Sequence, residues 1–359
     1  MSKQGKTLVI LSPGFPANEA DSTCVPPQQV FVKNLKQNFP SLNIIVLAFQ
    51  YPFLRSEYQW HGITVIAFGG ENKGRFSRLR NWIRIWIKLR KLNKQYELIG
   101  LLSFWMGECA FMANIFAKRN GLKHFYWILG QDAMPGNKYF KWIKPKEESL
   151  IALSDFIAKE FCKNYKIKPG HVIPVGIDPT MFGIPASSER DIDILGAGSL
   201  IPLKQYYLFI DAIKYLKDDY PNIRGVICGK GPEFEPLQAM IKSLHLEKNV
   251  ELMGELPHTC VLALMQRAKI FVHTSAYEGF GVVCLEALYA GTQVVSFVKP
   301  MDAIIKHWHF TQLPGYMLKV VRDLLANPVA DHSPVLPYPV NDSTKAMMKL
   351  FDYNEAAIS

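Results

Sequence analysis

The sequence lacks any hydrophobic run long enough to cross a membrane. No stretch of the 359-residue chain approaches the roughly 18 apolar residues that a spanning helix needs. The first residues, MSKQGKTLVILSPGFP, hold only a short apolar segment. A secretory signal has a longer apolar core and a small-residue cleavage site, so this segment predicts a first strand. We therefore expect a cytoplasmic protein.

Closely spaced cysteines are also absent. The six cysteines are Cys24, Cys109, Cys162, Cys228, Cys260 and Cys284. No two of them form a C-x-x-C pair, whereas zinc sites and disulfide frameworks use closer spacing. We expect reduced thiols and no metal. His307, Trp308 and His309 lie together, but no second group of ligands accompanies them, and packing or surface positions explain them better.

Acidic residues are too few to balance the basic ones. The chain has 41 Lys and Arg against 31 Asp and Glu, a formal net charge of +10. This balance favours an anionic partner, which could be nucleic acid, anionic lipid or a phosphorylated ligand. No helix-turn-helix, zinc-finger or RNA-binding sheet pattern is present, so we expect no nucleic acid partner.

Short apolar runs alternate with helical patterns along the whole chain. The expected strands lie within residues 6–13, 43–50, 63–69, 98–104, 124–130, 150–154 and 171–177, and then within 191–199, 223–231, 250–256, 270–275 and 292–297. Nearly continuous apolar strands separated by helices are typical of parallel sheets covered on both faces. The two series predict an α/β protein with two Rossmann-like domains.

The two series are joined near GIDPTMFGIPASSERD, where Gly, Pro and Ser gather. We therefore expect an N-terminal domain at 1–175 and a C-terminal domain at 176–335. A proline-rich connector and a last helix would form the segment 336–359. Ligands of open α/β sheets bind beyond the carboxyl ends of the strands, so the predicted site is a cleft that the two sheets face.

The segment SAYEGFGVVCLEALYAGTQVVSF places two acids around a helix start. Glu278 is in the loop after a strand, and Gly279 and Gly281 let the backbone approach a ligand. A helix that begins near Val282 offers N–H groups to a phosphate. Glu286, one turn into the helix, suits a ribose diol. Without the glycines, two surface acids would be the simpler interpretation.

This segment resembles the E-x7-E signature of glycosyltransferase family 4, whose members are retaining enzymes of the GT-B fold. Four further motifs resemble that family, in its order along the chain: VIPVGIDPTMF, GAGSLIPLKQYYLFIDAIKYL, VICGKGPEFEPL and NVELMGELPH. They lie within residues 172–297. The resemblance implies transfer of a sugar from a nucleotide-diphosphate sugar to an acceptor hydroxyl, with retention of configuration and without a cofactor or metal.

The resemblance also assigns roles to residues. The positions assigned to the donor nucleotide sugar are Gly14, Gly198, Ser199, Lys204, Gly229, Gly231, Glu233, Gly279, Phe280, Gly281, Val282 and Glu286. Glu278 would lie against the donor sugar and Glu286 would bind ribose, while Lys204 would neutralise the leaving diphosphate. Asp132 is the third residue expected to be catalytic. The acceptor would be a carbohydrate or lipid-linked molecule of the cell envelope.

Three departures from the family pattern stand out. Ser199 replaces an arginine of the phosphate loop. Leu129 replaces a histidine in the segment LGQD, where Gln131 or Asp132 could serve instead, or where the segment could be a structural turn. VKPMDAIIKHW replaces a glycine-rich donor loop.

These departures keep two alternatives open, which are a GT-B sugar-nucleotide epimerase and a non-catalytic protein that binds a sugar nucleotide as one subunit of a larger enzyme. A dinucleotide site at Gly196-x-Gly198 is disfavoured, because Ile201 stands where a third glycine is needed.

Residues 73–94, KGRFSRLRNWIRIWIKLRKLNK, hold nine basic residues and no acid. On a helix, one stripe contains Arg80, Arg84, Lys88 and Lys91. A second stripe contains Leu79, Trp82, Ile83, Trp86 and Leu89. Such a helix suits an anionic membrane surface, which would place the protein peripherally on a membrane. A helix packed on the sheet with a solvated cationic face is the alternative.

Overall fold

The computed structural model describes residues 3–184, 189–327 and 331–354, and it divides into two compact units. Unit 1 comprises Met1–Gly176 and Val340–Ser359, and unit 2 comprises Ile177–Pro339. The boundaries expected from the sequence, 175/176 and 335/336, therefore lie one and four residues from the observed ones. Within the described residues, no helix is both long and apolar enough to span a membrane.

Unit 1 contains an eight-stranded sheet in the order β3-β4-β2-β1-β5-β6-β7-β8. Its strands are β1 (Gln4–Gly14), β2 (Asn43–Tyr51), β3 (Ser56–Trp60), β4 (Ile63–Ala67), β5 (Tyr96–Phe104), β6 (His124–Ile128), β7 (Leu150–Ala152) and β8 (His171–Val172). All neighbours are parallel except β3 and β4. The sequence did not predict β3, because its residues SEYQW form a mostly polar strand at the sheet edge.

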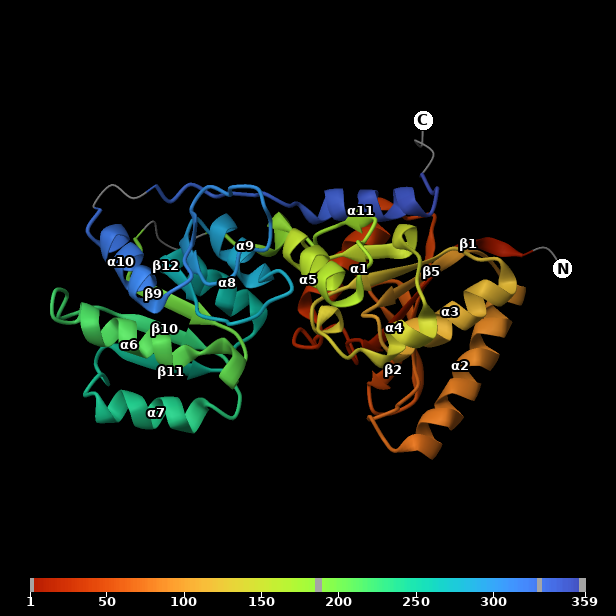
Figure 1. Cartoon of the computed structure of the whole chain (residues 1–359), viewed down its shortest axis with the longest axis horizontal. Helices are drawn as coiled ribbons and strands as arrows, with labels where there is room; N and C mark the ends of the chain where they lie inside the picture. Colours follow the sequence, from red (N-terminus) through yellow and green to blue (C-terminus); the bar gives the residue numbers. More distant parts are fainter. Residues whose placement is uncertain (1–2, 185–188, 328–330, 355–359) are drawn as a thin grey trace. The chain divides into compact units, whose positions relative to one another are not determined.

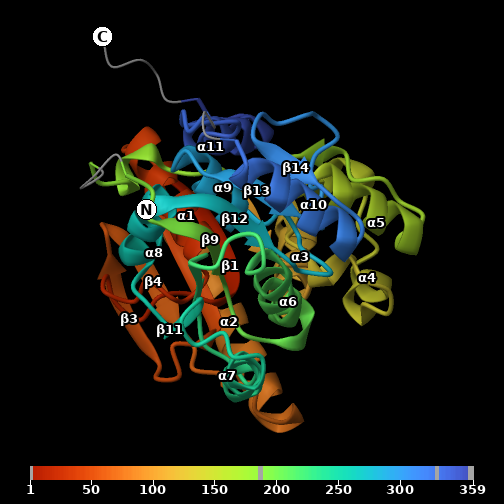
Figure 2. The same cartoon turned by 90° about the vertical axis from the view of Figure 1, so that its left-hand side faces the viewer.

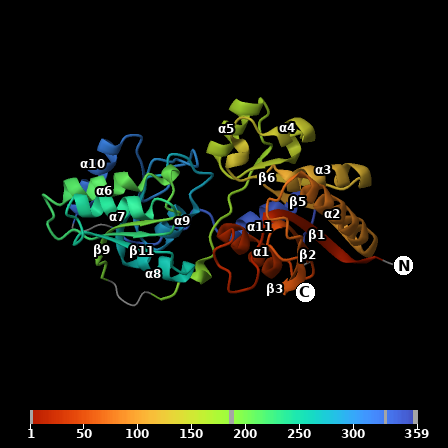
Figure 3. The same cartoon turned by 90° about the horizontal axis from the view of Figure 1, so that it is seen from below.

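Helices cover both faces of this sheet (Figures 1 and 3). The helices of unit 1 are α1 (Pro26–Asn38), α2 (Arg75–Gln95), α3 (Glu108–Asn120), α4 (Lys138–Ile143), α5 (Asp155–Tyr165) and α11 (Val340–Leu350), with short turns at Gln131–Ala133 and Glu147–Ser149. The helices α2 and α3 share one apolar core with β1, β2 and β5. The last helix, α11, packs on α1, where Asn34 Nδ2 donates to Asn341 Oδ1 over 2.6 Å. Two segments far apart in the sequence thus complete one unit.

Unit 2 contains a six-stranded, wholly parallel sheet in the order β11-β10-β9-β12-β13-β14 (Figure 2). Its strands are β9 (Ile192–Ala197), β10 (Gly225–Cys228), β11 (Val250–Gly254), β12 (Ala268–His273), β13 (Gln293–Ser296) and β14 (Trp308–Phe310). The edge strand β14 was not predicted, because only three residues form it and His309 at its centre interrupts the apolar pattern.

Helices also cover both faces of the second sheet. They are α6 (Tyr206–Leu216), α7 (Phe234–Ser243), α8 (His258–Arg267), α9 (Val282–Tyr289) and α10 (Pro314–Leu325), with short turns at Pro179–Met181 and Pro202–Lys204. One core joins α6, α7 and α10 to the sheet, and α8 lies on the opposite face (Figure 3). The predicted α/β architecture with two parallel sheets is confirmed. This architecture brings the strand-end loops of unit 2 to one edge of its sheet.

Both ends of α9 follow from the local sequence. The helix begins at Val282, as predicted, after Gly281, whose positive φ of 77° suits glycine. At the other end, Thr292 N–H donates to Ala287 over 2.9 Å and Gly291 N–H donates to Leu288 over 3.0 Å. With Gly291 at φ 79°, these two bonds form a Schellman motif. The predicted glycine C-cap is therefore confirmed.

Candidate active site

The loops that follow β9 and β10 are joined by backbone hydrogen bonds. Gly198 N–H donates to the Cys228 carbonyl over 2.9 Å, and Leu200 N–H donates to the Lys230 carbonyl over 2.8 Å. Gly229 N–H in turn reaches the Gly254 carbonyl at the end of β11, over 2.7 Å. Four positions predicted to bind the donor, Gly198, Ser199, Gly229 and Gly231, therefore lie on adjoining loops at one edge of the sheet.

Glycine is required at two of these positions by close backbone contact. A Cβ atom on Gly229 would lie 1.8 Å from the Gly198 carbonyl oxygen, and one on Gly231 would lie 2.2 Å from the Leu200 oxygen. Both glycines also have φ near 150°, which other residues rarely adopt. Glu233, at the start of α7, donates its N–H to the same Leu200 oxygen over 3.0 Å. The G-x-G-P-E turn is therefore a fixed backbone platform.

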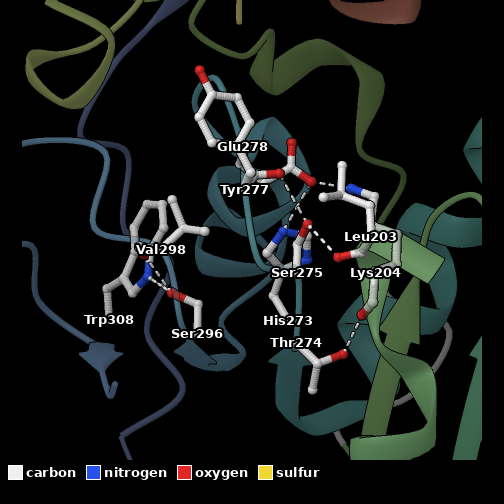
Figure 4. Close-up of polar contacts among 10 residues, drawn as sticks. All are labelled: Leu203, Lys204, His273, Thr274, Ser275, Tyr277, Glu278, Ser296, Val298 and Trp308. Carbon is white, nitrogen blue, oxygen red and sulfur yellow. Dashed lines mark hydrogen bonds and ion pairs between the residues drawn. The ribbon is translucent and has the colours of Figure 1, made fainter. Parts of the chain in front are cut away.

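The turn Pro202–Lys204 is attached to the loop after β12 (Figure 4). Ala276 N–H donates to the Leu203 carbonyl over 3.0 Å. The Thr274 hydroxyl donates to the Lys204 carbonyl over 2.6 Å. These bonds fix the backbone of Lys204 beside the loop that carries Glu278.

Lys204 and Glu278 form an ion pair in which Lys204 Nζ donates to Glu278 Oε1. The imidazole Nε2 of His273, at the end of β12, lies 3.3 Å from the same oxygen. The second carboxylate oxygen, Oε2, has no hydrogen-bond partner in the described part of the chain. One oxygen of Glu278 is thus held by the protein, and the other is available to a ligand.

The electrostatics of this cluster favour an ionised Glu278. Burial alone would raise the pKa of the carboxyl, but the neighbouring His273 ring and the Lys204 cation hold it at about 2. His273 is only 3% exposed, and burial lowers its pKa in spite of the nearby carboxylate. The cluster at neutral pH therefore contains an anionic Glu278 and an uncharged His273.

The second acid, Glu286, has a partner of its own. His258 Nε2 donates to Glu286 Oε1 over 2.8 Å. Burial would lower the pKa of His258, but the Glu286 carboxylate raises it above the usual value. His258 begins α8, directly after the loop that follows β11. The carboxylate of Glu286 is therefore oriented by a neighbouring helix.

A family model, "Glycosyl transferases group 1", matches residues 178–322. The match covers most of unit 2, which thus resembles a glycosyl transferases group 1 domain. The matched range contains Lys204, Glu278 and Glu286, the residues around which the site is built. The resemblance drawn from the sequence motifs is confirmed at the level of this group.

Curated relatives match part of the chain. The GPI3 subunit of phosphatidylinositol N-acetylglucosaminyltransferase from Saccharomyces cerevisiae is 32% identical over 120 residues, which is 33% of this chain and 26% of that protein. The glycogen synthase of Mycobacterium tuberculosis is 29% identical over 207 residues, which is 56% of this chain and 49% of that protein. The chain therefore matches between about a quarter and a half of the length of these relatives.

Solved structures share the fold over nearly the whole chain. HepE of Anabaena, in complex with UDP and glucose, has a TM-score of 0.72 at 15% identity, with 96% of this chain and 99% of HepE covered. A glycosyltransferase of Rickettsia africae also has a TM-score of 0.72, at 13% identity, with 98% of each chain covered. At these identities the comparison concerns the fold, and the fold is GT-B.

Two residues that the family 4 resemblance assigned to the donor, Phe280 and Ser199, differ in how they can contribute. The ring of Phe280 is buried and packs edge-on against Tyr338, with the ring centroids 5.6 Å apart. The Phe280 side chain therefore faces the interior, and only its backbone is left for a donor contact. Ser199, in contrast, is exposed on the phosphate loop, so the missing arginine leaves an open surface there.

Gly14 and Asp132 belong to unit 1. Gly14 is buried where β1 ends and is paired with Tyr51 of β2. The buried Asp132 carboxylate accepts the backbone N–H groups of Met106, Leu129 and Gly130 over 2.8 to 3.1 Å. Burial raises the pKa of Asp132 to about 6, against the lowering effect of these bonds. The bonds support the structural-turn interpretation of LGQD, and catalysis by Asp132 stays a prediction.

Sequence reasoning missed two residues of the site, His258 and His273. His258 ends the motif NVELMGELPH, and His273 lies in the strand expected within residues 270–275. Two signals in the sequence indicated them. His258 directly follows a proline at a helix start, and His273 ends an apolar strand that leads to Glu278. Within the described ranges, no group of three His, Cys, Asp or Glu side chains could hold a metal ion, and independence from a metal stays a prediction.

Proposed function

We propose that the protein is a retaining glycosyltransferase that moves a sugar from a nucleotide-diphosphate sugar to an acceptor hydroxyl. The observation that carries the proposal is the pairing of Lys204 with Glu278 beside the start of α9, within a group 1 domain. A lysine and a helix start both favour phosphate. Relatives whose names state glycosyl transfer, and a neighbour solved with UDP and glucose, support the same chemistry.

The diphosphate of the donor would compete with Glu278 for Lys204. Once Lys204 turns to the phosphate, His273 still faces Oε1 of Glu278, while Oε2 is available to a sugar hydroxyl. Glu286, oriented by His258, would accept hydrogen bonds from the ribose. The α9 N-terminus and Lys204 would then stabilise the charge that develops on the leaving diphosphate.

The transfer itself needs no protein nucleophile in this proposal. The bond between the sugar C1 and the phosphate oxygen breaks, and the acceptor oxygen forms its bond to C1 on the same face. The acceptor proton passes to an oxygen of the departing diphosphate. The proposed acceptor is a carbohydrate or lipid-linked molecule of the cell envelope, reached from a peripheral position on a membrane.

Calorimetric titration of UDP, GDP, ADP and NAD into the wild type and Glu286→Ala tests the donor site. We expect one nucleoside diphosphate to bind and Glu286→Ala to weaken it roughly tenfold or more, because hydrogen bonds to a charged group are lost. Glu247→Ala is the matched control, since Glu247 is exposed in the loop after α7. Binding of NAD alone, or of none of the four, would refute the donor site.

Turnover separates the enzyme from its two alternatives. With the bound donor identified, nucleoside diphosphate should be released when an acceptor is present. Donor binding without turnover on any acceptor would favour a non-catalytic role. Conversion of the donor without an acceptor would favour an epimerase.

A further inference from the structure

Helix α2 has an outward face that differs from the one its sequence pattern suggested. The helix packs on unit 1 through Ile85, Leu89 and Leu92, which are nearly or completely buried. The sequence pattern grouped Leu79 and Ile83 with Leu89, but both are exposed. That grouping is wrong, because the apolar residues of α2 occupy two opposite faces.

Four large apolar side chains form a row along the exposed side of α2. Phe76 is 85% exposed, Leu79 55%, Ile83 53% and Ile87 49%. They are spaced three, four and four residues apart, which aligns them on one side of a helix. A helix that only covers a sheet normally turns polar residues to solvent along this line. The row is therefore an apolar surface that no described residue of unit 1 covers.

Basic side chains flank this row. Arg80, Arg84 and Lys91 are exposed and form no ion pair within the described ranges of the chain. Lys88, by contrast, is paired with Glu57 of β3 over 2.8 Å. The helix itself contains no acidic residue. The outer face of α2, defined as the apolar row together with these three cations, thus combines apolar and positive surface.

The composition of this face discriminates between partners. Contact with a second copy through the same face would bring like charges together, which is unfavourable. A nucleic acid would pair with the cations but would leave the apolar row without a partner. The surface of an anionic bilayer offers phosphate groups to the cations and an acyl boundary to the apolar side chains.

We propose that the outer face of α2 docks the protein on the surface of an anionic membrane. The helix lies in the interface, with Phe76, Leu79, Ile83 and Ile87 in the acyl boundary. The long side chains of Arg80, Arg84 and Lys91 extend from the helix to the lipid headgroups. This inference specifies the surface for the membrane position put forward above. It does not depend on glycosyl transfer, so the two proposals can fail separately.

Vesicle flotation tests the docking surface with the full chain. Wild type is mixed with vesicles of phosphatidylcholine, alone or with phosphatidylglycerol, at low and high salt. We expect binding to the anionic vesicles only, weakened by salt. The double variant Ile83→Ser/Ile87→Ser should lose on the order of tenfold in partitioning per side chain. Arg80→Glu/Arg84→Glu should abolish binding.

Matched variants in unit 2 control for general changes in hydrophobicity and charge. Ile304→Ser/Leu313→Ser removes two apolar side chains that are also exposed. Lys242→Glu/Lys248→Glu reverses two exposed charges. Both controls should float like the wild type, and all variants should keep the circular dichroism spectrum of the wild type. Nucleotide titration of each variant reports separately on the donor site.

Three results would overturn the proposal. The first is wild type that stays unbound at low salt. The second is vesicle binding that changes equally in the α2 variants and in the unit 2 controls, or that changes in none of them. The third is lipid-free dimerisation in sedimentation velocity that Arg80→Glu/Arg84→Glu abolishes, because the face would then bind a second copy.

Discussion

Replacement of Glu278 by glutamine tests the ion pair at the centre of the site. The change keeps the shape of the side chain but removes the charge that faces Lys204 and His273. Glu278 is 19% exposed and Lys204 17%, so solvent screens their interaction only partly. The pKa of Glu278 is about 2 against an ordinary value of 4.5. The difference corresponds to about 3 kcal/mol of unfolding free energy at neutral pH.

The pH dependence of this contribution has a definite sign. Because the folded-state pKa is lowered, the stabilisation is complete above the unfolded value of 4.5 and is lost as the pH falls toward about 2. The unfolding free energy of the wild type should therefore exceed that of Glu278→Gln by about 3 kcal/mol at pH 7, but by only about 1 kcal/mol at pH 3. Glu247→Gln, at an exposed position, should show no such change.

Urea unfolding followed by pulsed hydrogen exchange measures these differences in unit 2 alone. Peptides from β12 and α9 report on unit 2, and peptides from β1 and α3 report on unit 1. Only the first set should respond to Glu278→Gln. A variant as stable as the wild type at pH 7, or a stability gap that is equal at pH 7 and pH 3, would refute the assigned charge state.

Two further substitutions examine neighbouring parts of the site. His273→Phe removes the imidazole that faces Oε1, so the pKa of Glu278 should rise from about 2 toward 4.5 in an NMR titration of labelled glutamate; an unchanged titration would exclude a positioning role for His273. Gly229→Ala should cost more than about 3 kcal/mol of unfolding free energy in urea titrations, because its Cβ would lie 1.8 Å from a backbone oxygen at φ 150°. Gly254→Ala, at φ 69° with nothing within 4 Å, should cost only about 1 kcal/mol, and equal losses would contradict the close-contact argument.

The sequence was most informative where local patterns determine structure. The apolar runs predicted the central strands of both sheets, and the glycines around α9 predicted both of its ends. The proximity of Lys204 and Glu278 followed from the family motif and not from spacing, since 74 positions separate them. Only the hydrogen bonds of Leu203 and Lys204 to the loop after β12 explain how they meet.

The sequence was least informative where two apolar faces of one helix look alike and only packing shows which of them is buried. Helix α2 carries apolar residues on two faces, and periodicity alone cannot tell which face meets the sheet. In the structure, Ile85 and Leu89 pack against the sheet, and Ile83 is exposed. Strand β3 has no apolar run, because an edge strand with solvent beside it needs none. The contact of His273 with Glu278 was likewise not predictable from the sequence, because it depends on the direction of the side chain at the end of β12.

The ion pair between Lys204 and Glu278 has a consequence for donor recognition. A lone lysine at this position would attract any anion, whereas Lys204 is already neutralised by Glu278. A ligand must therefore compete with a carboxylate for the lysine and also satisfy the carboxylate that it displaces. A free phosphate can do only the first, but a sugar diphosphate can do both, because its hydroxyls can donate to Oε2. In the proposed function, the pair thus favours a complete donor over its leaving group, which carries the same phosphate charges but no sugar hydroxyl for Glu278.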